Sequence, residues 1–516
     1  MRARHFCWPR LLALAIAGWI AGTATLARGD DDRFAPVKER IAKALVDHNI
    51  PSFAVAVAHQ GQIVWEQGFG WADRENRVPA SEHSMYSLAS ISKPITATGL
   101  MVLVQKKAID LDKPINEYLG EAKLRARLGD AAGATVRRVA NHTSGLPLHY
   151  QFFYADEPYR APTRDETIRR FGNLVYAPGE HYQYSNLGYG VLDYIIERAG
   201  NRPYADYMRE EVFLPLGLTH TSVDVGPGLE AHQAIRYTPG GERIPFYAFD
   251  HPGASAVYSS AHDLVRFAMF HMKDRLPDQR QILSDESIDA MQQSTASTSN
   301  GSGYGVGWGS ADTSRGYHVV EHSGGMPGVS TICSLYPSEH LAVVVLCNGR
   351  APMTNLLRDM IVKIMLPEKK SEASKQSAPE GGEYKGFAPS AELTGKWKGK
   401  LVTHKGEQPL VLEIRESGDV HLRLAKQLET LLAGPSFAGG YLRGRFGGDL
   451  GTDDDRGRKY TLQLEAQLRD GRLVGPVTAH TEPDRWGQNA VTHWVELDRE
   501  APPAQPPADA AGQGSP

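Results

Sequence analysis

Cysteine is scarce in this sequence, which has only three in 516 residues. Cys7 lies among the first charged residues, ahead of an apolar stretch, and does not have the position of a lipidation cysteine. Cys333 and Cys347 fall in adjacent predicted strands, where the sequence leaves open a disulfide or two buried thiols. Neither has metal-ligand spacing, and no cluster of His and Cys elsewhere resembles a zinc site, so no metal is predicted.

An excess of charge of one sign is also missing, since 56 basic residues face 60 acidic ones and the formal net charge is −4. Nucleic-acid-binding domains usually carry a basic patch or a strongly basic composition. This balance argues against a nucleic-acid partner. A small-molecule or peptide substrate is the expected partner, and the sequence does not indicate the oligomeric state.

Long apolar runs are absent except near the N-terminus, where Leu11–Ala21 follows Arg2, Arg4 and Arg10. A short apolar stretch behind basic residues and ahead of small ones is typical of a secretory signal peptide. The stretch is short for a membrane span, and an uncleaved anchor is the alternative interpretation. We predict cleavage after Ala27, a secreted or periplasmic protein, and no stable membrane span after cleavage.

The chain is too long for the usual single hydrophobic core, and its composition changes twice. A polar stretch with few apolar residues marks a linker, and a final Pro- and Ala-rich stretch has little to bury. The predicted organisation is a signal peptide (1–27), a main domain (28–367), a linker (368–391), an all-β domain (392–498) and a disordered tail (499–516).

The order of patterns in the main domain predicts an α/β (α+β) fold. Hairpins lie near both of its ends, each beside a helical pattern, and a loop-rich region with short helices lies between them. We therefore expect an antiparallel sheet between helical layers, with a helical lobe beside it. In 392–498 apolar and polar residues mostly alternate, as in Leu410–Ile414, which predicts a small barrel or sandwich.

Ser90 and Lys93 are the first candidates for chemistry. Residues three apart share one face of a helix, so the serine hydroxyl and the lysine amine can come within hydrogen-bond reach. An amine in a partly desolvated pocket has a lowered pKa and can help to remove the serine proton. The motif Ser-x-x-Lys is weak on its own and gains weight only from partners downstream.

Tyr184 and Asn186 are the second pair of candidates, just before a Gly-rich helix start. A positively charged Lys93 nearby would make the Tyr184 hydroxyl easier to ionise. Tyr184 could then accept the proton of Ser90 and later protonate the leaving group. Asn186 would hold Lys93 in place or bind a substrate amide.

The third candidate stretch is His322-Ser323-Gly324-Gly325, beside a predicted strand. Its glycines would let a substrate approach the backbone closely, and the Gly325 N–H could pair with the Ser90 N–H as an oxyanion hole. We expect His322 to line the floor of the site. Taken singly, the second stretch could be an ordinary turn and the third a hairpin connector.

These three motifs, taken in this order, resemble those of the penicillin-recognising serine hydrolases. Tyr184 in the second motif resembles the branch with class C β-lactamases, D-aminopeptidases and family VIII esterases, and the turn 141–147 resembles that branch's His-Thr-Ser-Gly-Leu signature. The resemblance implies a β-lactamase/transpeptidase-like fold, with Ser90 as nucleophile, Lys93 as its activator and Tyr184 as general base and acid. It implies an acyl-enzyme and no cofactor.

His322 departs from the family pattern, because β-lactamases and D,D-peptidases usually have lysine there. A histidine near pH 7 is mostly neutral and offers no permanent charge to a substrate carboxylate. The sequence therefore favours a small ester or a D-amino-acid amide or peptide as substrate. The alternatives are a D,D-carboxypeptidase or β-lactamase, and a sensor that is acylated without turnover.

The all-β domain begins with Leu393–Trp397 and resembles the lipocalin-like C-terminal domains of some of these hydrolases. A Gly-x-Trp at the start of a barrel is also explained by packing alone. The sequence leaves open whether this domain covers the active-site mouth, binds a ligand or mediates assembly.

Overall fold

The structure is a computed structural model that describes residues 32–298, 300–350, 353–369, 386–483 and 486–500. The predicted signal peptide lies outside these residues, as do 370–385 of the predicted linker and 501–516 of the predicted tail. None of the helices in the described part of the chain has the length and apolarity needed to cross a bilayer.

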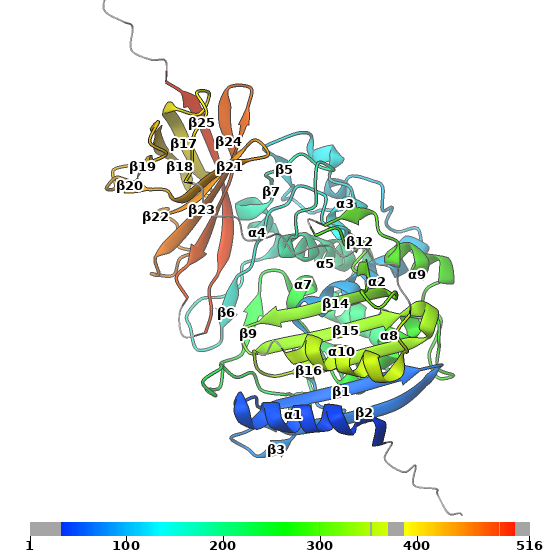
Figure 1. Ribbon diagram of the computed structural model, residues 1–516. Helices are drawn as coiled ribbons and strands as arrows, with labels where there is room; N and C mark the ends of the chain where they lie inside the picture. Colours follow the sequence, from blue (N-terminus) through cyan, green and yellow to red (C-terminus); the bar gives the residue numbers. More distant parts are fainter. Residues whose placement is uncertain (1–31, 299, 351–352, 370–385, 484–485, 501–516) are drawn as a thin grey trace, which may run out of the picture.

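A nine-stranded antiparallel sheet organises the main domain (Figure 1). Its strands in spatial order are β11 (Ala296–Ser297), β12 (Gly303–Tyr304), β13 (Gly309–Asp312), β14 (His318–Met326), β15 (Val329–Tyr336), β16 (Leu341–Cys347), β1 (Ser52–His59), β2 (Gln62–Asp73) and β3 (Val78–Pro79). Because side chains alternate along a strand, the buried strand β1 sends Phe53, Val55 and Val57 to one core and Ala54 and Ala56 to another.

Helices cover both faces of this sheet, as predicted. The α-helices of the whole main domain, including those of the helical lobe, are α1 (Ala35–Asp47), α2 (Ser92–Gln105), α3 (Val136–Ala140), α4 (Arg164–Phe171), α5 (Asn186–Gly200), α6 (Tyr204–Met208), α7 (Pro252–Ser255), α8 (Ala261–His271), α9 (Asp285–Gln292) and α10 (Met353–Met365). In Figure 1, α1 and α10 lie over the near face, and their apolar residues share a core with β1 and β16. Helix α8 packs on the opposite face.

The register of the sheet decides the state of the two cysteines. Cys333 lies opposite Val344, whereas Cys347 lies opposite Ser330. An offset of three residues puts the two side chains on opposite faces, one in each core. Both cysteines are free and buried, so the second of the two alternatives holds.

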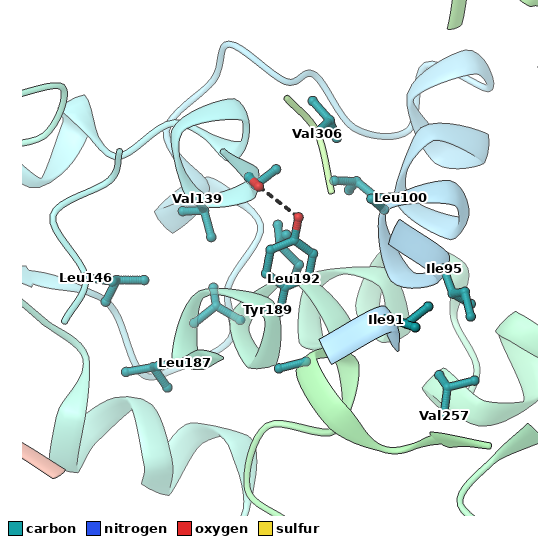
Figure 2. Close-up of a cluster of buried hydrophobic side chains, with 14 of the residues drawn as sticks. Ile91, Ile95, Leu100, Val139, Leu146, Leu187, Tyr189, Leu192, Val257 and Val306 are labelled. Carbon is teal, nitrogen blue, oxygen red and sulfur yellow. Dashed lines mark hydrogen bonds between the residues drawn. The ribbon is translucent and has the colours of Figure 1, made fainter. Parts of the chain in front are cut away.

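The helical lobe is built around α2 and α5, which pack against each other. Figure 2 shows apolar side chains of these two helices together with those of neighbouring segments. The Tyr189 hydroxyl donates a hydrogen bond to the Ala140 carbonyl at 2.8 Å. The Ser185 hydroxyl caps α5 by accepting from the Gly188 N–H. Short strands complete the domain: β4 (Tyr86–Ser87), β5 (Arg125–Ala126), β6 (Phe152–Tyr154), β7 (Asn173–Leu174), β8 (Thr221–Val223), β9 (Tyr247–Phe249) and β10 (Val257–Ser259).

The C-terminal domain is a nearly closed, barrel-like antiparallel sheet. Its strands are β17 (Gly395–Thr403), β18 (Gly406–Ile414), β19 (Val420–Leu424), β20 (Thr430–Leu431), β21 (Ala433–Ala438), β22 (Tyr441–Gly448), β23 (Tyr460–Arg469), β24 (Arg472–Thr481) and β25 (Ala490–Arg499). Alternate residues such as Leu410, Leu412 and Ile414 fill its interior. Trp397 is buried there, and its indole N–H donates to the Leu393 carbonyl at 2.8 Å.

The barrel lies beside the helical lobe (Figure 1). The start of β25 pairs with the main domain, because the backbone N–H groups of Tyr150 and Ala490 each donate to the other's carbonyl at 2.9 Å. The Phe152 N–H donates to the Asn489 side-chain oxygen at 3.0 Å, and the Thr492 hydroxyl donates to the Leu148 carbonyl at 2.9 Å. The two domains are thus joined by backbone hydrogen bonds close to 148–152.

Candidate active site

Ser90 lies in a single 3₁₀ turn, Ala89–Ile91, that leads directly into α2. Ala89 has a φ of +49°, a left-handed conformation that an alanine seldom adopts and that sharpens the bend before the serine. The Ser90 oxygen lies 3.1 Å from the Lys93 amine and 2.9 Å from the Tyr184 hydroxyl. The three predicted side chains therefore meet at one point.

Lys93 is completely buried and has only uncharged hydrogen-bond partners. Besides Ser90, its amine donates to the Asn186 side-chain oxygen at 2.8 Å and to the Ala254 carbonyl at 3.2 Å. Burial without a compensating carboxylate disfavours the ammonium form and lowers the pKa of Lys93 well below its ordinary value. This environment favours an amine that can accept a proton.

Tyr184 is half-buried, and its ring lies 4.7 Å from the Lys93 amine. Burial of the hydroxyl raises the pKa of Tyr184, and this effect exceeds the opposing effect of the hydrogen bond to Ser90. The expectation that Lys93 makes this phenol easier to ionise is therefore wrong in direction. The reason is that both groups share one desolvated pocket, which disfavours both charged forms.

Asn186 begins α5 and connects the lysine to the structure behind it. Its side-chain oxygen accepts from Lys93, and its amide nitrogen donates to the His149 carbonyl at 2.9 Å. Both ends of the carboxamide are thus fixed. Of the two roles expected for Asn186, the geometry directly shows the contact with Lys93.

The third motif runs along β14, where neighbouring side chains alternate between the two faces. Ser323 and Gly325 are exposed, whereas His322 and Gly324 are buried. The His322 ring contacts its own chain at the Ser323 carbonyl, 2.7 Å from Nδ1, and the Tyr304 hydroxyl, 3.0 Å from Nε2. Burial and the nearby Lys93 lower the pKa of His322 to about 3, so the ring is neutral at neutral pH.

A cavity of about 630 Å³ opens at Ser90. The described residues that line it are Ser90, Tyr150, Phe152, Asn186, Thr238, Pro239, Ile244, Phe249, His251, Ser255, Gly325, Met326, Pro327, Gly328, Val329, Ser330, Arg350, Pro483, Trp486, Gly487 and Gln488. His322 is not among them, so the expectation that it lines the floor of the site is not met.

The two glycines of β14, Gly324 and Gly325, differ in their surroundings. A Cβ on Gly324 would lie 2.1 Å from the Leu88 carbonyl and 2.3 Å from the Thr331 hydroxyl, so only glycine lets this strand touch the turn before Ser90. A Cβ on Gly325 would meet nothing within 4 Å. Gly324 thus brings the strand to the serine, and Gly325 faces the open space above it.

We expect Gly324→Ala to lower the free energy of unfolding by about 1–3 kcal/mol, because the methyl group meets backbone that cannot move freely. Urea unfolding of the full chain measures this effect. Gly325→Ala is the matched control, with an expected change within about 0.5 kcal/mol, since nothing opposes its methyl group. Equal stability of the two variants would contradict the close packing of β14 on the turn.

Two residues that contact the side chains of the site were not predicted from the sequence. Tyr304 holds the His322 ring, and the Ala254 carbonyl accepts from Lys93. No local pattern marks either residue, because Tyr304 comes from the short strand β12 and Ala254 from the short helix α7, both distant in sequence from the residues that they contact. The buried His142 joins the turn 141–147 to the start of α5, because its Nδ1 accepts from the Ser185 N–H at 3.1 Å.

Two groups of residues in the described part of the chain have ligand atoms close enough for a metal ion: His149, Asp250 and His251, and His404, Asp453 and Asp454. In the first group, the buried Asp250 carboxylate already pairs with both imidazoles, at 2.7 and 2.6 Å. These contacts hold the pKa of Asp250 well below its usual range. The second group lies in the barrel and does not touch the cavity at Ser90.

The fold and the site together define a class of enzyme. A serine at the start of a buried helix, in contact with a lysine amine and a tyrosine hydroxyl and beside an accessible glycine of a sheet strand, is arranged for acyl transfer. This is the arrangement of a serine hydrolase with a β-lactamase-like fold.

Comparison with known proteins supports the assignment to this class of enzyme. The family model described as Beta-lactamase matches residues 37–362, and the chain belongs to this family. Among curated relatives, Penicillin-binding protein 4* of Bacillus subtilis (strain 168) is 28% identical over 320 residues, covering 57% of this chain and 67% of that protein. Protein flp of Staphylococcus aureus (strain N315) is 28% identical over 306 residues, covering 58% and 60%.

Solved structures share the fold. The octameric penicillin-binding protein homologue from Pyrococcus abyssi aligns with a TM-score of 0.57 and 21% identity, over 88% of this chain and 99% of that chain. A class C β-lactamase from Rhodobacter sphaeroides aligns with a TM-score of 0.54 and 22% identity, over 65% and 100%. The resemblance to penicillin-recognising serine hydrolases and the predicted fold are thereby confirmed.

Proposed function

We propose that the protein hydrolyses a small ester or a D-amino-acid amide or peptide through an acyl-enzyme on Ser90. The observation that carries the proposal is the contact of the Ser90 oxygen with both the Lys93 amine and the Tyr184 hydroxyl. The N–H groups of Ser90 and Gly325 are proposed to bind the oxyanion, and one such donor is typically worth about 3–4 kcal/mol.

On the basis of the pKa directions, we propose proton transfers that differ from the sequence-based hypothesis. Lys93, with its lowered pKa, takes the proton as the Ser90 oxygen attacks the carbonyl carbon. Tyr184, with its raised pKa, still holds a proton and gives it to the leaving group as that bond breaks. In deacylation, water gives its proton to Tyr184 while attacking the carbonyl, and Lys93 returns a proton to Ser90.

The environment of His322 supports an ester or a neutral amide over a carboxylate-bearing substrate. A lysine in this position would offer a permanent charge, whereas the buried His322 is neutral at neutral pH. The cavity is lined largely by apolar and aromatic side chains, and Arg350 is the one lysine or arginine among its described lining residues.

A D,D-carboxypeptidase or β-lactamase acting on cell-wall-like peptides is the second candidate, favoured by the name of the relative Penicillin-binding protein 4*. Comparing kcat/KM for p-nitrophenyl acetate, D-alanine p-nitroanilide and a cephalosporin discriminates between the two. We expect the ester or the D-alanyl amide to be the better substrate. A cephalosporin turned over faster than both would favour the second candidate.

We expect His322→Lys to raise kcat/KM for the cephalosporin by about tenfold, because the longer lysine side chain is expected to reach the cavity that the imidazole does not line, and a charged donor to a carboxylate adds roughly 1.5–3 kcal/mol. The uncharged p-nitrophenyl ester serves as the reference substrate, and its kcat/KM should not rise. An unchanged cephalosporin rate would count against the charge argument.

The third candidate is a sensor that is acylated and does not turn over. In this case the barrel would transmit the signal that Ser90 has been acylated. The observation in its favour is that barrel residues line the cavity at Ser90. A stable, stoichiometric adduct without product release, measured by intact-protein mass, would support this candidate over the hydrolase.

A further inference from the structure

The cavity at Ser90 extends to one side of the nucleophile. Ser90 and the oxyanion glycine Gly325 both line it, whereas Tyr184 is not among the described lining residues. In the proposed function, Tyr184 protonates the leaving group, so the leaving group must lie within hydrogen-bond reach of Tyr184. The cavity on the other side of the reacting carbonyl is then left for the acyl half of the substrate.

The wall of this acyl side comes partly from the barrel. Pro483, Trp486, Gly487 and Gln488 follow β24 and precede β25, and all four line the cavity. They lie outside residues 37–362, the part of the chain that matches the family. The family match therefore does not account for this wall.

The position of these barrel residues is fixed by contacts with two segments of the main domain, at Tyr150 and at Pro327. The paired backbone hydrogen bonds between Tyr150 and Ala490 hold the start of β25 against the main domain. The Gln488 amide donates to the Tyr150 hydroxyl at 3.3 Å. Gly487 lies against Pro327, where a Cβ would come within 2.8 Å of the proline ring.

Apart from the Gln488 amide, the side chains at this wall are apolar or aromatic. Trp486 packs against the cluster that contains Phe152 and Phe249, and its ring centroid lies 6.5 Å from that of Tyr154. Phe152 and Phe249 also line the cavity. Aromatic walls of this kind bind apolar and aryl groups by area and by ring contacts.

We propose that Trp486, together with Phe152 and Phe249, forms a subsite for the acyl group, and that the substrates carry a bulky apolar or aryl acyl group. The inference rests on the proposed function and names the substrate class of the same site. It assigns the barrel a direct part in substrate selection, in place of a role in assembly alone.

The test compares two esters with the same leaving group, p-nitrophenyl phenylacetate and p-nitrophenyl acetate, on the full chain. We expect the wild type to prefer the phenylacetate in kcat/KM. Trp486→Ala should lower the phenylacetate-to-acetate ratio about tenfold, whereas Trp486→Phe should keep most of it. Trp71→Ala, which removes a 44% exposed tryptophan from β2, should leave the ratio unchanged.

The experiment distinguishes failure of the acyl subsite from failure of the proposed function. A ratio that stays the same in Trp486→Ala, or an equal fall for both esters, would overturn the subsite while leaving Ser90-dependent hydrolysis in place. If the wild type turns over neither ester nor D-alanine p-nitroanilide, and Ser90 acquires no acyl group by intact-protein mass, the proposed function fails and the subsite fails with it.

Discussion

Replacing Ser90 by alanine is expected to abolish turnover of every substrate of this protein, with kcat/KM falling by roughly 10⁴–10⁶. The reason is that no second nucleophile stands in its place: Lys93 and Tyr184 converge on the Ser90 oxygen, and removing that oxygen leaves both without their reacting partner. The first measurement is the intact-protein mass after brief incubation with p-nitrophenyl esters, D-alanine p-nitroanilide and a penicillin.

An adduct that forms on the wild type and is absent from Ser90→Ala would establish the nucleophile. Ser314→Ala, at an exposed loop position, is the control and should behave as the wild type. Normal turnover by Ser90→Ala would show the assignment to be wrong. The variant should fold as the wild type does, since alanine is the smaller residue at a half-buried position.

Replacing Lys93 by methionine is expected to lower kcat/KM by roughly 10²–10⁴, the usual contribution of a positioned acid–base group. Methionine has a similar length and no titratable group, so it fills the buried space without accepting the serine proton. In the wild type, kcat/KM should rise with pH and level off well below the ordinary lysine pKa, because burial lowers the pKa of Lys93. The variant should lack this rise.

The lowered pKa of Lys93 also predicts how the free energy of unfolding changes with pH. Because the pKa of Lys93 is lower in the folded than in the unfolded chain, the unfolded chain binds more protons between the two values. Its contribution to the free energy of unfolding therefore increases with pH, by up to about 1.4 kcal/mol per pH unit. Chemical unfolding of wild type and Lys93→Met at pH 6–9 measures the difference in slope, and parallel slopes would place a charged lysine in the pocket.

The features that could be predicted from the sequence are those that depend on residues close together in the chain. The contact between Ser90 and Lys93 follows from their spacing on one helical turn. The alternation of apolar and polar residues likewise predicts strands with one interior face in the barrel. The three motifs, in their order, were sufficient to indicate the family.

The pKa of Tyr184 could not be predicted in the same way. A charged lysine near a phenol would lower the pKa of the phenol, but burial raises it here. Burial depends on what packs around the pair, including Asn186 and the Ala254 carbonyl, which come from separate parts of the chain. Similarly, the faces of Cys333 and Cys347 depend on a register in which a slip of one residue reverses every side chain.

The sequence by itself thus determined the three motifs, the sheet between helical layers and the separate all-β domain, because each is encoded by residues close together in the chain. Only the tertiary structure decided which groups are desolvated, that His322 contacts Tyr304 and does not line the cavity, and that barrel residues line the cavity at Ser90. The hydrogen bonds between Tyr150 and Ala490 join segments 340 residues apart (490 − 150), and no local pattern specifies such a contact. The physical reason is that desolvation and cavity shape are properties of packing between distant segments.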